Sequence, residues 1–365
     1  MKTEFETFTR QEVAERGEAF LWPPDPAVAL MPPSIWELVR THPDLPADLP
    51  VATALSIDGV RVASMGLISQ PLRIGGRVVP CLTGHSLYSH PDRRAGGVGG
   101  LLLRELLKNL AGRGLPFSAY GATPYANRLM TALRMVNVGL SPRWVIPLRS
   151  GPILRSRLGS VPLARVAAVA VDPLLRAWSL VQRARYRPSA AGHALEEVDS
   201  FAALRDFGLP ETPLVHVRRD AAYLDWKMRF ARHDAAVRAR AFRVVDESGR
   251  GAGHFLVRVA THERVGSQEY RDVRICRVLD LAMPSSADGA RAAVYHLLRV
   301  AARERADVLE VLTTDARIGS ACRSAGFRRS NGYEMLISRT AGLPDAAYAI
   351  DNWFLTMVES ESAFF

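Results

Sequence analysis

The segment at residues 85–107, HSLYSHPDRRAGGVGGLLLRELL, constrains the fold more than any other, because it joins a strand-like run to a helix-like run through glycines. Residues 85–89 are apolar and aromatic enough to end a strand, and Pro91 stops it. Residues 98–110 carry leucines at helical spacing. The segment therefore predicts a strand, a glycine turn and a helix, in that order.

The glycine turn is suited to phosphate. Glycines leave the backbone bare where the helix begins, so successive N–H groups can point at a phosphate at the positive end of the helix dipole. Arg93 and Arg94 add positive charge beside it. The turn matches neither the G-x-G-x-x-G of dinucleotide-binding folds nor the Gly-Lys-Ser/Thr of a Walker loop. Its glycines are Gly96, Gly97, Gly99 and Gly100.

The order Arg94-x-x-Gly97-x-Gly99, preceded by His90-Pro91-Asp92, closely resembles the acyl-CoA pyrophosphate loop of the GNAT superfamily of N-acyltransferases. The resemblance covers residues 50–150, which open with a hairpin signal at Asp58-Gly59 and continue in the GNAT order of strand, loop, helix, strand, helix and strand. It implies an α/β (α+β) fold, in which a mixed, mainly antiparallel sheet is flanked by helices.

The resemblance also implies a cosubstrate, acetyl-CoA or another acyl-CoA, and no metal. In the family, main-chain groups of the strand polarise the acyl carbonyl and the loop holds the pyrophosphate. The corresponding cofactor-binding residues of this chain are Leu87, Ser89, Arg94, Ala95, Gly96, Gly97, Val98, Gly99 and Gly100.

Length and composition predict two domains with real cores, since the chain has 365 residues, of which 48% are apolar. Its three cysteines are widely spaced and form no C-x-x-C, which indicates neither a disulfide framework nor a zinc site and suits a reducing cytoplasm. The first residues show no signal-peptide pattern, and no window is apolar enough to span a membrane. We therefore expect a cytoplasmic protein.

The net charge of +10 fits anionic partners such as CoA or a lipid headgroup surface. No nucleic-acid partner is expected, because no Lys/Arg tract with interleaved aromatics follows a recognisable nucleic-acid motif. Residues 151–194 mix arginines with apolar residues and read as a basic connector between domains. A basic amphipathic segment can also lie on an anionic membrane, so residues 151–190 are a candidate for peripheral membrane contact. The oligomeric state is left open.

The second half of the chain repeats the pattern of the first, with a hairpin at Ser248-Gly249 followed by strand, helix, strand, helix and strand. An internal duplication accounts for this order most economically. When the two halves are aligned through Pro284 and Pro91, alanines stand opposite Arg94, Gly97 and Gly99. These alanines are Ala287, Ala290 and Ala292. We therefore expect residues 1–150 to form a GNAT domain with an acyl-CoA loop, and residues 195–365 to form a degenerate copy that does not bind CoA.

An amine that attacks a thioester must lose a proton, so the site needs a route for that proton. His85 stands nine positions before Arg94, on the strand whose end splays apart in GNAT proteins to admit pantetheine. The run HSLYSHPDRRAGGVG resembles that of the arylalkylamine acetyltransferases, where a histidine at the matching position belongs to the proton path. The resemblance implies His85 as a general base, with a near-neutral pKa suited to the work. A histidine hydrogen-bonded in the core is the alternative.

Strand alternation predicts one face composed of Cys81, Thr83, His85, Leu87 and Ser89. On that face Thr83 is placed to orient a water. Many GNAT enzymes protonate the leaving thiolate with a tyrosine in the second helix, but matching NRLMTALRM to the family's N-x-L-Y-x-x-L-G-F puts Met130 at that tyrosine and Arg134 at the glycine. Tyr120, Tyr125 and Tyr88 are the alternatives for the acid; Tyr120 joins His85 and Thr83 in the candidate catalytic set.

The prediction from these observations is a tandem GNAT acyltransferase that transfers an acyl group, acetyl first, to a small amine or amino sugar. Two alternatives stay open. One is a Fem-like transferase that uses aminoacyl-tRNA, which also has paired GNAT folds but does not need the CoA loop. The other is a catalytically silent acyl-CoA sensor or scaffold, motivated by the missing tyrosine. The sequence identifies neither the acceptor nor the length of the acyl chain.

Overall fold

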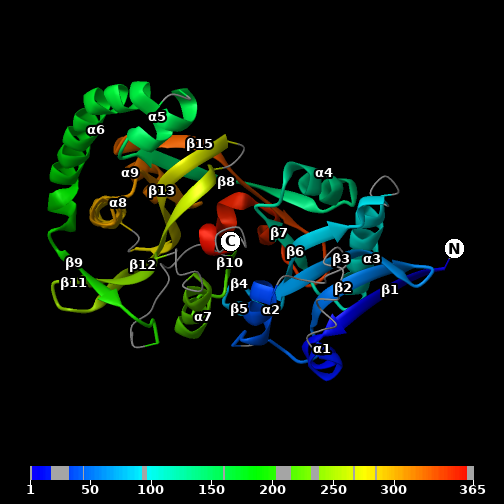
Figure 1. Ribbon diagram of the computed structural model, residues 1–365. Helices are drawn as coiled ribbons and strands as arrows, with labels where there is room; N and C mark the ends of the chain where they lie inside the picture. The colour runs from blue at the N-terminus through cyan, green and yellow to red at the C-terminus, as the bar shows by residue number, and fades with distance from the viewer. Residues whose placement is uncertain are drawn as a thin grey trace. The chain divides into compact units, whose positions relative to one another are not determined.

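The computed structural model describes residues 2–17, 33–43, 45–92, 97–158, 161–202, 215–231, 238–265, 268–283 and 286–359. Contacts divide the chain into two compact units (Figure 1). Unit 1 comprises Met1–Leu140, Leu214–Arg218 and Tyr333–Trp353, and unit 2 comprises Ser141–Pro213, Arg219–Gly332 and Phe354–Phe365. Each unit holds a mixed sheet with helices, which confirms the predicted fold class.

The main sheet of unit 1 is antiparallel except at one neighbouring pair. Its strands, in spatial order, are β1 (Thr3–Thr9), β2 (Pro50–Ile57), β3 (Val60–Ser69), β6 (Leu82–Ser89), β7 (Phe117–Tyr120) and the end of β15 (Arg328–Ile337). Only β6 and β7 run parallel among these described pairs. The predicted hairpin at Asp58-Gly59 is confirmed, since both residues have positive φ and connect β2 to β3.

Unit 1 also contains a small sheet and four helices. The small sheet has the order β16 (Trp353–Phe354), β10 (Val215–Val217), β4 (Leu72–Ile74) and β5 (Arg77–Val79). The helices are α1 (Arg10–Arg16), α2 (Pro33–Arg40), α3 (Val98–Gly112) and α4 (Pro124–Ala132). Helix α3 buries leucines at helical spacing against β2, β3 and β6, as its sequence predicts; these are Leu102, Leu103, Leu106 and Leu110.

The sheet of unit 2 follows the same plan. Its spatial order is the end of β8 (Val136–Pro147), β14 (Val308–Leu312), β13 (Gln268–Ala282), β12 (Gly251–Val265), β11 (Arg238–Asp246) and β9 (His193–Val198). Strands β13 and β14 are the parallel pair. The helices are α5 (Gly151–Leu158), α6 (Val161–Ala190), α7 (Ala221–Ala231), α8 (Ala287–Arg303) and α9 (Ala316–Ser324). The 3₁₀ turns η4 (Asp345–Tyr348) and η5 (Ile350–Asn352) belong to unit 1, and η6 (Met357–Glu359) belongs to unit 2.

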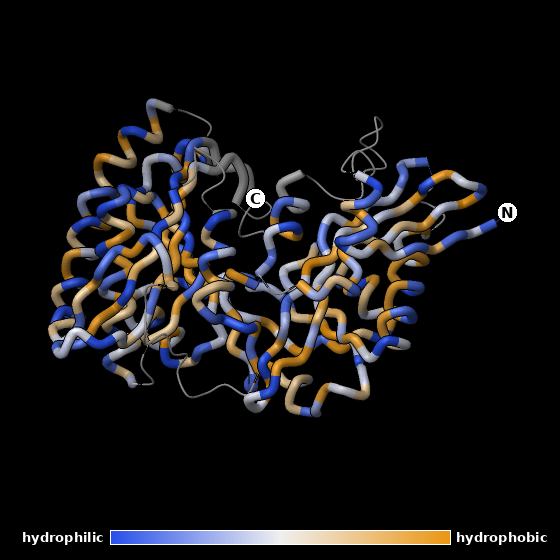
Figure 2. Tube along the Cα trace, turned by 90° about the horizontal axis from the view of Figure 1, so that it is seen from below, coloured by the Kyte–Doolittle hydropathy of each residue, from blue (hydrophilic) through white to orange (hydrophobic). Residues whose placement is uncertain are grey.

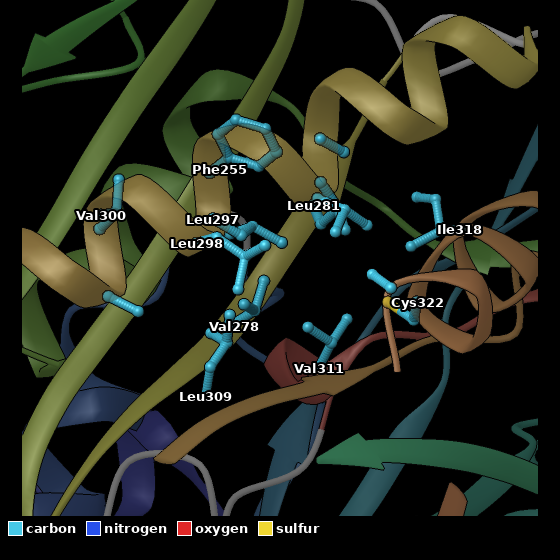
Figure 3. Close-up of a cluster of buried hydrophobic side chains, with 14 of the residues drawn as sticks. Phe255, Val278, Leu281, Leu297, Leu298, Val300, Leu309, Val311, Ile318 and Cys322 are labelled. Atoms are coloured by element: carbon cyan, nitrogen blue, oxygen red, sulfur yellow. The ribbon is translucent and has the colours of Figure 1, made fainter. Parts of the chain in front are cut away.

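The core of unit 2 lies between its sheet and helices α8 and α9. Figure 3 shows Leu297 and Leu298 of α8 facing Val278 of β13, with Val311 and Cys322 beside them. All five side chains are buried. Figure 2 shows hydrophobic and hydrophilic stretches alternating along the Cα trace. Burial of this apolar surface is the main stabilising contribution to such a unit.

The halves of the sequence exchange their last strands. Strand β8, from the first half, pairs with β14 in unit 2, and Met335 of β15, from the second half, pairs with Tyr120 in unit 1. Each compact unit is therefore made of segments from both halves of the sequence. The domain boundaries at residues 150 and 195 stay predictions. Residues 151–190, predicted as a connector, form α5 and α6 of unit 2. No helix in the described ranges is long and apolar enough to cross a membrane.

Candidate functional site

Strands β6 and β7 of unit 1 separate soon after they meet. Their parallel pairing joins Leu82 to Phe117 and Thr83 to Ser118, and among the described residues it goes no further. Beyond Ser118, β7 pairs on its other side with β15, where Tyr120 faces Met335. The carboxyl-terminal half of β6 is thus left without a ladder on the β7 side, which is the splayed arrangement that the resemblance implies.

A bulge in β6 lies at the same place. Ser64 of β3 pairs with Tyr88, but Gly66 pairs with His85, so β6 carries Ser86 and Leu87 opposite a single residue of β3. Ser86 has a φ of 52°, in the left-handed region that a residue with a side chain rarely adopts. A bulge bends the strand away from its neighbour and turns the following side chains.

The bulge corrects the expected face of β6. Because each pair in a ladder shares a face, Thr83 and His85 lie on the same side, opposite Ile68 and Gly66. Beyond the extra residue the alternation is reversed, so Leu87 and Ser89 do not share the face of His85, as strict alternation predicted. Both side chains instead approach Gly99 at the start of α3. Alternation alone could not show this, because it assumes an unbroken strand.

His85 is buried, with 2% of its surface exposed. Its imidazole occupies the space over Gly66, where an added Cβ atom would stand 2.0 Å from Cε1 of His85. Burial lowers the pKa of His85 from its ordinary value near 6.5 to about 3, because the charged form is desolvated. The expected near-neutral pKa is therefore wrong, and the imidazole is neutral at pH 7.

The other two candidate catalytic side chains are also buried. The Thr83 hydroxyl donates to the carbonyl of Ser118 at 3.0 Å, across the last pair that joins β6 to β7. Tyr120 lies at the end of β7, and its ring meets that of Tyr333 edge-on at 5.7 Å. Among the alternative acids, Tyr125 is exposed on α4 and Tyr88 is half-buried on β6. Tyr120 is thus the most enclosed of the three tyrosines.

The structure supports the match of α4 to the family pattern. Arg134, at the position of the family's glycine, has a φ of 67°, the left-handed conformation for which glycine is usually chosen. Met130, at the position of the family's tyrosine, is buried in α4 and carries no ionisable group. The acid of that pattern is therefore missing from this helix.

The first turn of α3 presents bare backbone. Gly97 is its N-cap in the left-handed conformation, with a φ of 68°, and no side chain caps the helix or places an acidic group in its first turn. The first bond within the helix runs from Leu101 N–H to the Gly97 carbonyl, so the N–H groups of Val98, Gly99 and Gly100 precede the helical ladder. Such a turn attracts phosphate.

Glycine is also needed at residue 99 for close approach. An added Cβ atom there would lie 2.7 Å from Oγ of Ser89, and at Gly100 it would lie 3.1 Å from Leu129. The backbone at the start of α3 therefore packs directly against side chains of β6 and α4. Arg94, Ala95 and Gly96 of the predicted loop lie outside the described residues.

The matching turn of unit 2 is built differently. Ser286 is the N-cap of α8 and accepts the Gly289 N–H at 2.9 Å, while Asp288 adds negative charge to the first turn. The two N-caps match Gly97 with Ser286 and not with Ala290, which corrects the alignment made through the prolines. A hydroxyl that occupies the backbone donor and a carboxylate beside it both oppose phosphate.

The described residues include no group of three or more metal-ligating side chains.

No protein-family model and no curated protein sequence matches the chain. Solved structures do. N-myristoyltransferase of Saccharomyces cerevisiae, with bound myristoyl-CoA and inhibitors, is 12% identical, with a TM-score of 0.54 over 98% of this chain and 86% of that one.

Two bacterial structures agree. A GCN5-related N-acetyltransferase from Anabaena variabilis is 12% identical, with a TM-score of 0.51 over 92% of this chain and 72% of that one. Eis1 from Mycobacterium abscessus is 16% identical, with a TM-score of 0.51 over 95% and 76%. At these identities the likeness concerns the fold. Together with the repeated plan of the two units, it confirms the predicted architecture: the chain has the GNAT fold in a tandem arrangement.

Proposed function

We propose that this protein is an acyl-CoA-dependent N-acyltransferase whose reaction takes place in unit 1. The observation that carries the proposal is the meeting of splayed strand β6 with the bare first turn of α3, where Ser89 stands against Gly99. The turn offers N–H groups to a pyrophosphate, and the gap in the ladder exposes backbone of β6 to the pantetheine and acyl group.

The reaction joins the amine nitrogen to the acyl carbon and breaks the bond from that carbon to sulfur. The amine gives up a proton and the departing thiolate receives one. Thr83 and His85 share a face of β6, so together they offer a route for the amine's proton. With a pKa of about 3, the His85 imidazole would be protonated only transiently and would transfer the proton to the next acceptor. Tyr120 is the candidate for protonating the thiolate.

The acceptor that we propose is a small amine or amino sugar. Among the acyl-CoA donors, acetyl-CoA is our first candidate. The solved structure of S. cerevisiae N-myristoyltransferase contains myristoyl-CoA, so donors of several chain lengths belong in the test. A protein acceptor would need a docking surface for its chain, for which the sequence offers no dedicated segment.

Thiol release tests the proposal directly. The full chain is incubated with acetyl-CoA or a longer acyl-CoA and a panel of amines, amino sugars included, and free CoA is titrated. Release that depends on the amine, with the acylated amine identified by mass, supports the function. Absence of acyl-CoA binding by calorimetry would overturn it.

A silent acyl-CoA sensor is the second candidate, and two observations favour it. Met130 replaces the family's acid, and burial lowers the pKa of His85 far below neutrality. The sensor predicts acyl-CoA binding with no release of thiol for any amine. The same pair of experiments therefore separates an enzyme, a sensor and a protein that does not use CoA.

A further inference from the structure

A cavity of about 770 Å³ lies in unit 2, and its lining residues include none of the site described above. Among the described residues, eight arginines and four acidic side chains line it. They come from Arg149 just before α5, from α5, α6, β11, the first half of β13 and the end of α8, and from the turn that joins α8 to β14. Its volume lies within the range of small-molecule sites. Such a density of guanidinium groups needs an explanation, because like charges brought together repel one another.

Three of the four acidic side chains already form ion pairs or hydrogen bonds within unit 2. Glu304 pairs with Arg240 at 3.1 Å and with Arg274 at 3.7 Å. Asp307 accepts the backbone N–H of Arg274 at 2.8 Å, and Asp172 accepts the N–H and hydroxyl of Ser150, each at 2.6 Å. These carboxylates therefore hold the wall of the cavity together.

The guanidinium groups of four lining arginines make no ion pair and no hydrogen bond with a described residue; these arginines are Arg155, Arg165, Arg238 and Arg305. They reach the cavity from α5, α6, β11 and the turn after α8. Their positive charge is directed at the same space from four elements. An anion in the cavity would compensate it and accept several charge-assisted hydrogen bonds.

The backbone of Arg305 is strained. Helices α3 and α8 end in the same motif, in which Leu115 N–H bonds to the Leu110 carbonyl and Ala306 N–H bonds to the Ala301 carbonyl. Unit 1 places Gly114 at the left-handed position, whereas unit 2 places Arg305 there, with a φ of 53°. A left-handed residue with a side chain costs about 1–2 kcal/mol relative to the right-handed form. A function for the guanidinium accounts for an arginine at this position.

The cavity is not the second unit's version of the CoA turn. That turn would lie at the start of α8, beside Ser286, whereas the cavity lies at the end of α8, beside the turn before β14 and the first half of β13. No aromatic side chain is among its described lining residues, so it offers no surface for stacking a nucleotide base. We propose that this cavity binds a compact anion that carries two or more phosphate groups.

The test uses the full chain and inorganic tripolyphosphate, titrated by calorimetry. With excess CoA present to occupy the turn of α3, wild type should bind one tripolyphosphate per chain, with an affinity that falls as salt is added. Arg305→Gly should weaken binding by about tenfold or more, since it removes one guanidinium from a charge-assisted contact. The variant should fold at least as well as wild type, because glycine prefers the left-handed backbone.

The matched control is Arg134→Gly, which replaces the other left-handed arginine discussed above, in unit 1 and outside the cavity. It should bind tripolyphosphate as wild type does. Absence of binding by wild type, or equal loss in both variants, would overturn the proposal. Vesicles of phosphatidylcholine with a phosphoinositide distinguish the source of the phosphates: binding to vesicles that tripolyphosphate displaces and Arg305→Gly abolishes identifies a lipid headgroup, and binding of tripolyphosphate alone identifies a soluble ligand.

A second inference concerns the outer face of α6 and rests on a separate observation, the exposed apolar side chains of this helix. The inner face of this helix packs beside α8 and buries Ala164, Ser179 and Tyr186. The opposite face exposes large apolar side chains at helical spacing; these are Leu163, Val166, Val169, Leu174, Leu180 and Val181. Their exposed fractions range from 57% to 76%. So long an apolar stripe on a surface helix marks an interaction site.

Arginines follow one border of this stripe, at Arg165, Arg176, Arg183 and Arg187, which fall on one side of the helix at 100° per residue. An apolar face bordered by arginines is complementary to an anionic lipid surface, with the side chains buried among acyl chains and the guanidinium groups at the headgroups. We infer that α6 lies on the surface of an anionic membrane.

Co-sedimentation with vesicles tests this inference. The chain should bind vesicles of phosphatidylcholine with phosphatidylglycerol, and pure phosphatidylcholine far less. Val166→Glu with Leu174→Glu should abolish binding, because both carboxylates would enter the lipid interface. Val60→Glu, at an exposed valine of unit 1, is the control and should bind normally. Failure to bind anionic vesicles, or a stripe variant that only breaks self-association seen by light scattering, would overturn the inference.

Discussion

The imidazole of His85 lies where a side chain of Gly66 would have to stand, since an added Cβ atom would be 2.0 Å from Cε1 and 2.1 Å from Nε2 of His85. The two residues are paired across β3 and β6, next to the bulge at Ser86. The absence of a side chain at Gly66 thus decides where the histidine sits.

Gly66→Ala should displace the His85 ring and reduce both stability and activity. Overpacking of a buried site costs about 1–3 kcal/mol. Urea unfolding and thiol release measure the two effects. Gly112→Ala, in α3 with open space around it, is the control and should leave the free energy of unfolding unchanged or raise it by up to about 1 kcal/mol. Equal stability of Gly66→Ala and wild type would mean that His85 occupies another position.

His85→Gln should lower turnover by roughly 10², the lower end of the contribution of a positioned proton carrier. Affinity for acyl-CoA should stay nearly unchanged. Because the pKa of His85 is about 3, the profile of activity between pH 5.5 and 7.5, roughly one unit either side of the ordinary histidine pKa, should keep its shape in the variant. A wild-type limb near 6.5 that the variant loses would show that the imidazole titrates in the working enzyme.

His85 should also make stability depend on pH. Above pH 6.5 the imidazole is neutral in both the folded and the unfolded chain. Below pH 6.5 the unfolded chain binds a proton at His85, whereas the folded chain binds it only near pH 3, the pKa of His85 in the folded chain. Stability should therefore fall by about 1.4 kcal/mol per pH unit from this residue as pH drops across that window. Urea unfolding at a series of pH values gives the free energy of unfolding as a function of pH. In His85→Gln, the slope of this function should be smaller by the contribution of one proton. The same slope in both proteins would contradict the burial of the ring.

Gly97→Ala with Gly99→Ala should weaken acyl-CoA binding at least tenfold, about 1.4 kcal/mol. The alanines strain the left-handed N-cap and crowd the backbone beside Ser89. Gly114→Ala imposes the same left-handed strain at the other end of α3 and should bind normally. Wild type should bind one acyl-CoA per chain, because Ser286 and Asp288 close the matching turn of unit 2. A stoichiometry of two would contradict that interpretation.

Asp280 anchors a buried polar cluster of unit 2. It accepts from Arg219 Nε at 3.1 Å and from the Thr356 hydroxyl at 2.8 Å, and it lies 2.9 Å from Nε2 of His254. Burial would raise its pKa, but the Arg219 guanidinium and the hydrogen bonds from His254 and Thr356 outweigh burial and lower it. Its stabilisation is therefore present above the unfolded pKa and is lost as pH falls below it.

Asp280→Asn should cost about 3–5 kcal/mol, because it leaves the buried Arg219 with less compensation. Urea unfolding at neutral pH measures the loss. Asp288→Asn, at an exposed carboxylate of the same unit, should change the free energy of unfolding by less than about 0.5 kcal/mol. A loss no larger than that of the control would show that the cluster contributes little to the fold.

Local chemistry made much of this protein predictable from its sequence. The glycines and leucines of residues 96–110 predict a bare turn and an amphipathic helix, and the structure has Gly97 as a left-handed N-cap followed by α3. Asp58-Gly59 predicts the hairpin that joins β2 to β3. The repetition of this order in the second half predicts the tandem arrangement. Each inference depends on neighbours in the sequence, whose conformational preferences are intrinsic.

Only the tertiary structure decided the remaining features, because they depend on partners distant in sequence. The pairing of β6 with β3 produces the bulge at Ser86 and turns Leu87 and Ser89 toward Gly99. Enclosure by unit 1 lowers the pKa of His85, which no spacing reveals. The exchange of β8 and β15 interleaves the two halves. The arginine cavity gathers residues from 149 to 307, and convergence of charge over that range exists only once the chain has folded.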